Sequence, residues 1–232
     1  MDIVKGKLID QDSIKKIYAT DHEDKLLWIF RDDMPSDAKT KKLKNRGKYN
    51  GEIAAALYKY LSSYHLQTIY VDSEESEMIV MHAEPFPIQI KVWNFASDDL
   101  AKRFKFDKWS ELCCPIVEYS ITDEKGKASL VNFDHLCALQ IAENDDLQVM
   151  DRMTRKTNAV LKSFFSRRSM LLADCTLTFA KLNDKFVLFD PITMDSIRIL
   201  DVEQTAKPDT KRFDFSSGDN SEQSEALHGR IV

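Results

Sequence analysis

Glycine is scarce in this chain, which contains only six glycines in 232 residues. None of them belongs to a GxGxxG or GxxxxGK[ST] pattern, and the sequence contains neither HExxH nor GxSxG. These absences exclude a standard glycine-rich phosphate loop, a zincin-type metal site and a nucleophile elbow. A nucleotide would therefore have to be held in another way.

Cysteines and long apolar runs are also few. The four cysteines, Cys113, Cys114, Cys137 and Cys175, form no CxxC pair, so we expect reduced thiols rather than a zinc site or a disulfide framework. The N-terminus has no apolar core of signal-peptide length, and no apolar run approaches the ~20 residues that span a bilayer. We therefore predict a cytoplasmic protein without a membrane partner.

An excess of basic charge is missing as well, because 33 Lys and Arg residues face 38 Asp and Glu residues and leave a net charge of −5. A general nucleic-acid binder is usually basic, so we expect no nucleic-acid partner. The hydrophobic fraction of 43% and the charged fraction of 31% are typical of a globular protein. The length suffices for one large domain or for two small domains that share a cleft.

Hydrophobic periodicity predicts strands around one helix in the first third of the chain. The apolar or alternating runs that predict strands are residues 25–30, 67–71, 77–81 and 88–92. Apolar residues at three- and four-residue spacing predict an amphipathic helix over residues 53–61, with Asn50 as a candidate N-cap.

The middle of the chain reads as helical. Ser97 is a good N-cap for a helix over residues 98–104, and Asp134 is a candidate cap for a second helix. The longest apolar stripe covers residues 149–165 and predicts a helix packed on the core.

Strands return near the C-terminus. Residues 170–179 and 185–190 flank a plausible turn at 182–184 and predict a hairpin that places Thr178 nearly opposite Asp190. The order of elements predicts an α+β fold with two lobes. The predicted segments are a β-rich N-terminal lobe with one helix (1–84), an α+β C-terminal lobe (85–213) and a polar, loosely ordered tail (214–232).

Three features could carry chemistry. Lys15 and Lys16 could place an ammonium against nucleotide phosphates, although a solvated strand edge is the plainer explanation. The basic run 39–48 could bind a phosphorylated ligand or RNA, or could be a solvated loop. Asp174 and Asp190 could hold Mg²⁺ together with substrate phosphates, although acids at strand ends are more often structural.

Short motifs follow one another along the chain in a characteristic order. They are Lys15-Lys16-Ile17-Tyr18, Phe30-Arg31-Asp32-Asp33, Gly47 with Asn50, Ser76-Glu77-Met78-Ile79-Val80, Asn94 with Leu100-Ala101-Lys102-Arg103, Asn158-Ala159-Val160-Leu161, Leu172-Ala173-Asp174, Asp190 with Asp195, Arg198 and Asp201, and Arg212-Phe213. As a co-linear set over roughly residues 5–213, these motifs resemble the SAICAR synthetase family.

This resemblance implies a two-lobed SAICAR-synthetase-like (ATP-grasp-like) fold with the nucleotide in a cleft between the lobes. It implies an ATP-dependent ligase that joins aspartate to the carboxylate of a carboxyaminoimidazole ribonucleotide in purine biosynthesis. The carboxylate is phosphorylated first, and the acyl phosphate is then attacked by the amine. ATP and Mg²⁺ are the implied cofactors, because cations must neutralise the phosphate charge that shifts during transfer.

The resemblance also implies residue roles. The cofactor-binding candidates are Lys15 at the ATP phosphates and Met81, His82, Glu84 and Phe86 beside the adenine. The catalytic candidates are Asp190 and Arg198, and the metal candidates are Asp190 and Asp174. The substrate-binding candidates are Asn94, Lys102, Arg103, Arg198 and Arg212, and the run 39–48 would help to cover the phosphorylated ligand.

Several family positions hold other side chains here. The replacements are Ser13 and Thr176 for lysines, Trp93 for the arginine and Asp99 for the serine that serve the ribonucleotide phosphate, Thr178 for the metal-binding glutamate, and Pro191 for the second acid of a DE pair. An arginine offers a bidentate cationic fork, whereas tryptophan offers one neutral donor.

Three hypotheses follow from these departures. The chain is a divergent working SAICAR synthetase, or a relative with an altered substrate or no catalysis that acts as a ligand-binding or interaction protein, or an unrelated binding protein, against which the co-linear match argues. The predicted partners are nucleotide and small-molecule substrates, and a homodimer is a candidate assembly.

Overall fold

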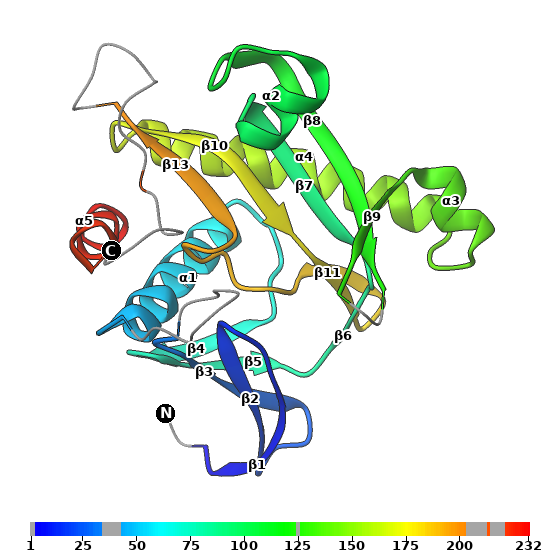
Figure 1. Cartoon of the computed structure of the whole chain (residues 1–232). Helices are drawn as coiled ribbons and strands as arrows, with labels where there is room; N and C mark the ends of the chain where they lie inside the picture. Colours follow the sequence, from blue (N-terminus) through cyan, green and yellow to red (C-terminus); the bar gives the residue numbers. More distant parts are fainter. Residues whose placement is uncertain (1–2, 34–42, 124–125, 203–212, 214–220) are drawn as a thin grey trace.

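The computed structural model describes residues 3–33, 43–123, 126–202, 213 and 221–232 (Figure 1). In this part of the chain, helices pack against three sheets whose strand pairings are all antiparallel. The predicted α+β class is confirmed.

The first sheet contains the N-terminal strands in the order β1-β2-β3-β5-β4. Its strands are β1 (Lys5–Gln11), β2 (Lys15–Thr20), β3 (Lys25–Phe30), β4 (Tyr70–Glu74) and β5 (Glu77–Met81). Helix α1 (Arg46–Ser63) packs against β3, β4 and β5. The start of α1 approaches the sheet closely, because a Cβ atom on Gly47 would lie 2.6 Å from the Phe30 carbonyl oxygen.

The second sheet has the strand order β13-β10-β7-β8-β9. Its strands are β7 (Gln89–Phe95), β8 (Glu111–Thr122), β9 (Ala128–Val131), β10 (Met170–Leu177) and β13 (Ile197–Asp201). Helix α4 (Asn144–Ser166) packs behind β10 and β7, as Figure 1 shows, and buries Met150, Leu161 and Phe165. The helix predicted from the apolar stripe is therefore confirmed.

The shorter helices α2 (Asp98–Phe104) and α3 (Phe133–Ala138) flank β8 and β9. The helix predicted over residues 98–104 is confirmed. The predicted cap of α3 is wrong by two residues, because Asn132 rather than Asp134 occupies the N-cap and forms a capping box with His135.

The third sheet has the order β12-β11-β6, with β6 (Glu84–Pro85), β11 (Phe179–Leu182) and β12 (Lys185–Leu188). Asn183 and Asp184 form the β11–β12 turn, both with positive φ (50° and 59°), as a two-residue hairpin turn requires. A parallel bridge between Thr68 and Leu188 ties β12 to the segment before β4.

The hairpin prediction is right for β11 and β12 and wrong for residues 170–177. Those residues form β10, which pairs with β7 and β13 in the second sheet. The sequence pattern continues through Thr178, but the chain changes sheets at that residue.

Asn50 is not an N-cap, because α1 begins at Arg46 and Asn50 lies inside it. Its side chain is buried and makes long-range hydrogen bonds: Nδ2 donates to Asp195 Oδ2 at 3.1 Å, and Oδ1 accepts the Met194 N–H at 3.2 Å. Asn50 therefore joins α1 to the loop before β13.

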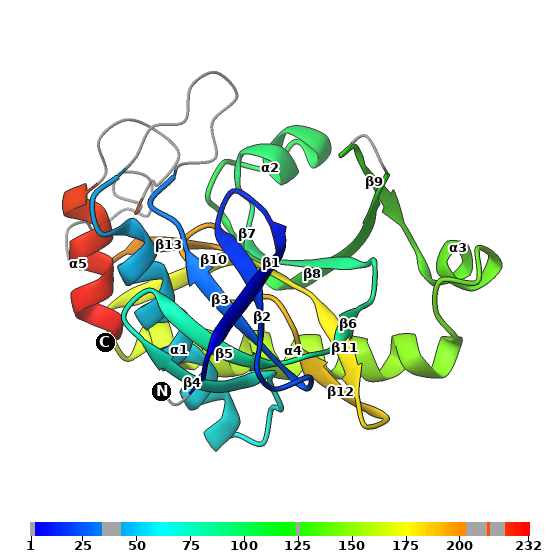
Figure 2. The ribbon, with the colours of Figure 1, turned by 90° about the horizontal axis from the view of Figure 1, so that it is seen from below.

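The prediction of a loosely ordered tail is wrong for residues 221–231, which form helix α5 (Ser221–Ile231); residues 214–220 lie outside the described part. Helix α5 lies beside α1 (Figure 2) and buries Leu227 and Ile231 in the core. His228 Nε2 also lies 2.5 Å from Glu52 Oε2 of α1. These contacts order a segment that is polar overall.

One hydrophobic core runs from the first sheet through α1 to α4 and the second sheet. The division at residues 84 and 85 stays a prediction. Within the described ranges, no helix is both long and apolar enough to cross a bilayer.

Candidate functional site

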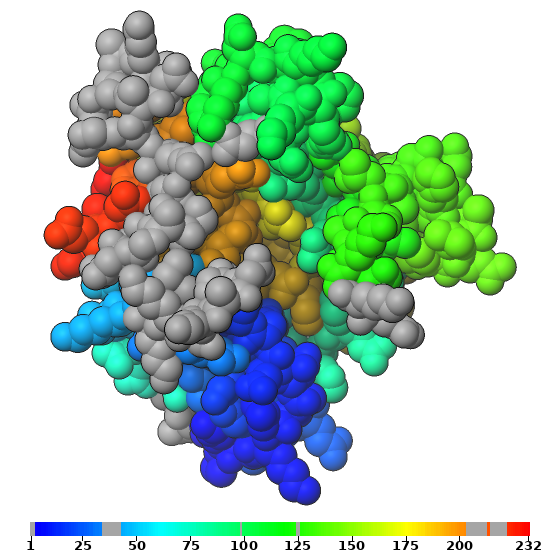
Figure 3. Space-filling view, in the orientation of Figure 1, coloured from blue at the N-terminus to red at the C-terminus, as the bar shows by residue number. Residues whose placement is uncertain are grey.

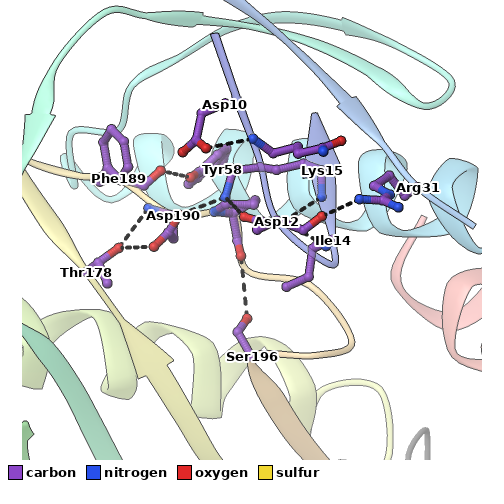
Figure 4. Close-up of polar contacts among 12 residues, drawn as sticks. Asp10, Asp12, Ile14, Lys15, Arg31, Tyr58, Thr178, Phe189, Asp190 and Ser196 are labelled. Atoms are coloured by element: carbon purple, nitrogen blue, oxygen red, sulfur yellow. Dashed lines mark hydrogen bonds and ion pairs between the residues drawn. The ribbon is translucent and has the colours of Figure 1, made fainter. Parts of the chain in front are cut away.

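Lys15 starts strand β2, and its ammonium contacts the carboxylates of Asp12 and Asp190 (Figure 4). Its Nζ lies 3.0 Å from Asp12 Oδ2 and 3.0 Å from Asp190 Oδ1, with the Trp28 ring centroid 4.8 Å away. The Lys15 side chain is 7% exposed, whereas those of Asp12 and Asp190 are 46% and 42% exposed. The acids therefore face solvent and the cation lies beneath them.

Asp190 lies two residues after β12 and is fixed by Thr178, the residue before β11. The Asp190 N–H donates to Thr178 Oγ1 at 2.9 Å, and the Thr178 hydroxyl donates to Asp190 Oδ2 at 2.9 Å. The Tyr58 hydroxyl donates to the Phe189 carbonyl at 2.8 Å. Thr178 and Asp190 thus lie nearly opposite each other, as predicted, with Phe189 in direct register because its N–H donates to the Thr178 carbonyl at 3.0 Å. We call Asp12, Lys15, Thr178 and Asp190 the Lys15 cluster.

Both partners of the Asp12–Lys15 pair are charged at neutral pH. Burial alone would lower the pKa of Lys15, but the carboxylates of Asp190 and Asp12 outweigh it and hold the pKa above its ordinary value. Burial would raise the pKa of Asp12, but the Lys15 charge and the N–H groups of Lys15 and Ile14 hold it below its ordinary value. One ammonium and two carboxylates give this cluster a net charge of −1.

The same residues suit a magnesium ion that shares its coordination with phosphates. Asp12 and Asp190 offer carboxylate oxygens on either side of one ammonium, and Mg²⁺ prefers oxygen donors. Among the described residues, no group of three or more His, Cys, Asp or Glu side chains is placed to hold a metal. This donor set fits Mg²⁺ bound through one or two carboxylates plus substrate phosphates and water.

Asp174 forms a second charged cluster in the second sheet. Its buried carboxylate lies 3.4 Å from Lys91 Nζ and 2.6 Å from Arg198 Nε. Burial raises the pKa of Asp174, and the charges of Lys91 and Arg198 oppose that rise. Two cations on one carboxylate leave a net charge of +1.

Trp93 joins this second cluster to β8. Lys91 Nζ lies 4.2 Å and Arg198 Cζ 5.4 Å from the Trp93 ring centroid, and the indole N–H donates to Glu118 Oε2 at 2.8 Å. Arg103 NH2 also donates to Glu118, at 2.7 and 2.8 Å. We call Lys91, Trp93, Asp174 and Arg198 the Asp174 cluster.

A hollow of about 370 Å³ opens beside the Asp174 cluster and is lined by Lys91, Trp93, Asp99, Arg103 and Glu118 among others. The space-filling view in Figure 3 shows a face hollowed between the blue N-terminal strands and the green β7–β9 region, with gold atoms at the floor. The charged side chains that line the hollow come from the second sheet and α2.

Comparison with known proteins identifies the family. The SAICAR synthetase family model matches residues 8–221. The chain belongs to the SAICAR synthetase family. It is 31% identical to the phosphoribosylaminoimidazole-succinocarboxamide synthase of Chloroherpeton thalassium, with 98% of each chain covered.

Solved structures of SAICAR synthetases have the same fold. One, in complex with ADP, has a TM-score of 0.88 at 25% identity, with 97% of each chain covered. The enzyme from Ehrlichia chaffeensis has a TM-score of 0.89 at 22% identity, covering 97% of this chain and 98% of that one. The hypothesis of an unrelated binding protein is therefore wrong, and the degenerate relative is not favoured.

The structure places the family-derived substrate candidates in different surroundings. Arg103 borders the hollow, Arg198 is paired with Asp174 beside it, and Lys102 is exposed on α2. Asn94 is buried and exchanges two 2.9 Å hydrogen bonds with the Asn158 amide, so its role as a substrate ligand stays a prediction. Arg212 lies outside the described residues.

The segment predicted beside the adenine connects the first and third sheets. Met81 N–H donates to the Ile69 carbonyl at 2.8 Å, and the exposed His82 and Glu84 follow it. Phe86 stacks on Phe186 with ring centroids 5.5 Å apart. That Met81, His82, Glu84 and Phe86 bind the adenine of the nucleotide stays a prediction.

The basic run is only partly a loop. Residues 39–42 lie outside the described part, while Arg46 and Lys48 belong to α1. Arg46 is buried and paired with Asp195, and Lys48 Nζ lies 2.9 Å from Glu75 Oε1. The expectation that the whole run covers a ligand is therefore wrong for Arg46, because its charge is used inside the fold.

Three charged residues of the site were not predicted: Asp12, Lys91 and Glu118. Lys91 lies in the alternating run 88–92, but the sequence does not show that β10 and β13 follow β7 in the sheet and bring Asp174 and Arg198 to it. Asp12 lies three residues before Lys15, a separation that a turn can bring together, so the acidic residue before the lysine pair was the available signal.

Proposed function

We propose that this chain is an ATP-dependent SAICAR synthetase that joins the amine of aspartate to the carboxylate of carboxyaminoimidazole ribonucleotide in purine biosynthesis, through an acyl phosphate. The observation that carries the proposal is family membership along nearly the whole chain, with 98% of both chains covered in one relative. That relative is named a phosphoribosylaminoimidazole-succinocarboxamide synthase.

The nucleotide phosphates would lie at the Lys15 cluster. Lys15 supplies the ammonium that neutralises phosphate charge, and Asp190 supplies an oxygen ligand for magnesium. A relative of the same fold binds ADP, which supports a nucleotide at this site. When both are bound, ATP supplies the phosphoryl group, and Mg²⁺ stabilises the phosphate charge during transfer.

The acid substrate would lie at the Asp174 cluster. The cluster has two cations and one carboxylate, so its electrostatic field attracts a negatively charged substrate. The buried Trp93 ring lies beneath both cations and helps to fix their positions. Arg198 would thus orient the carboxylate that becomes phosphorylated, and its assignment as a catalytic residue is part of the proposal.

The direct test is product formation by the purified full chain. With ATP, Mg²⁺, aspartate and the carboxylated ribonucleotide, we expect succinocarboxamide ribonucleotide and ADP in equal amounts. Reactions that lack one substrate serve as controls. If no product forms under conditions in which another SAICAR synthetase turns over, the proposal is wrong.

A further inference from the structure

Asp12 holds both the backbone and the side chain of Lys15, and the two contacts use different oxygen atoms. Asp12 Oδ1 accepts the N–H groups of Ile14 and Lys15, both at 2.7 Å, and so closes the turn between β1 and β2. Asp12 Oδ2 contacts Lys15 Nζ at 3.0 Å. The shape of the turn and the charge beside Lys15 can therefore be changed separately.

Among the described residues, no cation other than Lys15 pairs with the Asp12 carboxylate. Arg31 NH1 donates to the Asp12 carbonyl at 2.7 Å, but its guanidinium is paired with Asp33 at 2.5 Å. The ammonium of Lys15 is shared between Asp12 and Asp190. The cluster consequently keeps its net charge of −1.

The exposure of these side chains decides what an incoming anion meets first. Both carboxylates are more than two-fifths exposed, whereas the Lys15 side chain is only 7% exposed. A free nucleotide therefore approaches a negative surface. A metal-bound nucleotide carries two fewer negative charges and brings a cation that carboxylates attract.

We propose that Asp12 makes nucleotide binding by this chain depend on a divalent cation, by adding a second carboxylate to the solvent face of the Lys15 site. The inference rests on the proposed function, since it assumes that nucleotide phosphates bind at Lys15. Asp12 acts through Lys15 and through the field of the site, so it is a positioning and specificity-determining residue rather than a catalytic one.

Asp12→Asn removes the negative charge of residue 12 but keeps the hydrogen bonds that close the turn. The amide oxygen can still accept the N–H groups of Ile14 and Lys15, while the negative charge is lost. Asp10→Asn is the matched control, because it removes one carboxylate two residues away, at the end of β1, and that carboxylate accepts a hydrogen bond from the Gln11 N–H. Asp12→Ser is a second test variant, since a serine hydroxyl can also close this kind of turn.

The experiment is calorimetric titration of the full chain with ADP, once with Mg²⁺ and once with EDTA. The measured quantity is the metal ratio, the Kd in EDTA divided by the Kd in Mg²⁺. We expect Asp12→Asn and Asp12→Ser to lower this ratio by about tenfold, mainly through tighter binding in EDTA, because one nearby like charge is removed. Asp10→Asn should leave the ratio within about twofold of the wild-type value.

The outcomes are distinguishable. An unchanged ratio in folded Asp12→Asn or Asp12→Ser, or an equal fall in Asp10→Asn, overturns the role of Asp12 while leaving the proposed function intact. A wild-type chain that binds no ADP even with Mg²⁺ overturns the nucleotide site itself and both proposals with it. Thermal melts followed by circular dichroism establish that each variant is folded before it is titrated.

Discussion

The Lys15 cluster and the Asp174 cluster have opposite arrangements of charge. In the first, a cation that is 7% exposed lies beneath two acids; in the second, an acid that is 3% exposed lies beneath Lys91 and Arg198, which are 32% and 34% exposed. The first presents negative charge to solvent and the second presents positive charge. The Lys15 cluster therefore suits a ligand that carries a metal ion, and the Asp174 cluster suits an anionic ligand.

The largest expected effect comes from removing the ammonium of Lys15 from the Lys15 cluster. Lys15→Met should lower kcat/KM by roughly 100- to 1000-fold, the cost of removing one preorganised charge-stabilising donor. Lys16→Met is the matched control, because Lys16 is the next residue of β2 and points to the other face of the strand. Steady-state kinetics would measure both, and equal losses in the two variants would contradict the assignment of Lys15.

The second largest effect should come from removing the buried acid of the second cluster. Asp174→Ala leaves Lys91 and Arg198 close together without their shared carboxylate, and we expect the free energy of unfolding to fall by roughly 2–3 kcal/mol. This loss of stability is smaller than the loss expected for a fully buried ion pair, because both cations are about one-third exposed. Urea denaturation measures the change.

The control for that prediction is Asp99→Ala, which removes an exposed acid from the same hollow and should change stability by less than about 0.5 kcal/mol. If Asp174→Ala were as mild as Asp99→Ala, the Asp174 cluster would not be an organised charge centre.

A smaller effect sharpens the contrast between the clusters. Glu118→Gln releases Arg103 from a carboxylate, so we expect the KM for the carboxylated ribonucleotide to fall by about threefold, the size of an exposed ion pair. The metal ratio for ADP should stay unchanged, unlike in Asp12→Asn. A metal ratio that fell in Glu118→Gln would show that the two clusters do not act separately.

The smallest effect tests whether the hairpin turn matters to the first cluster. Asp184 has a φ of 59°, a conformation that glycine adopts without strain, so Asp184→Gly should stabilise the fold by about 0.5 kcal/mol. The affinity for ADP with Mg²⁺ should not change, because the turn lies at the opposite end of the hairpin from Thr178. Thermal denaturation and calorimetry measure the two quantities.

Local patterns in the sequence predicted much of the fold and part of the site. The long helix α4 and the β11–β12 hairpin follow from periodicity and turn residues that act over a few positions, and the helix over 98–104 begins after Ser97 as predicted, although the Ser97 side chain makes no capping hydrogen bond. The meeting of Lys15 and Asp190 was predicted only through the resemblance to a family, since no local pattern connects residues 175 positions apart.

The features that sequence analysis missed depend on tertiary contacts. Helix α5 is polar overall, and only its packing against α1 makes Leu227 and Ile231 core residues. Asn50 has the composition of a cap, but its amide bonds to Asp195 and Met194, which a single sequence cannot reveal. The side chains of the Asp174 cluster, including Asp174 itself, come from three strands, so their proximity depends on the order of strands in the sheet.

The bridge between Thr68 and Leu188 has a mechanical consequence for the Lys15 cluster. Backbone hydrogen bonds from Ile69 to Leu188 and from Leu188 to Gln67, together with the Tyr58–Phe189 bond, fasten the residues just before Asp190 to the first sheet and α1. Asp190 is also bonded to Thr178, the residue directly after β10, so it is anchored to the second sheet as well. A shift of one sheet relative to the other would therefore have to strain one of these two sets of hydrogen bonds, which resists any change in the spacing between Asp190 and Lys15.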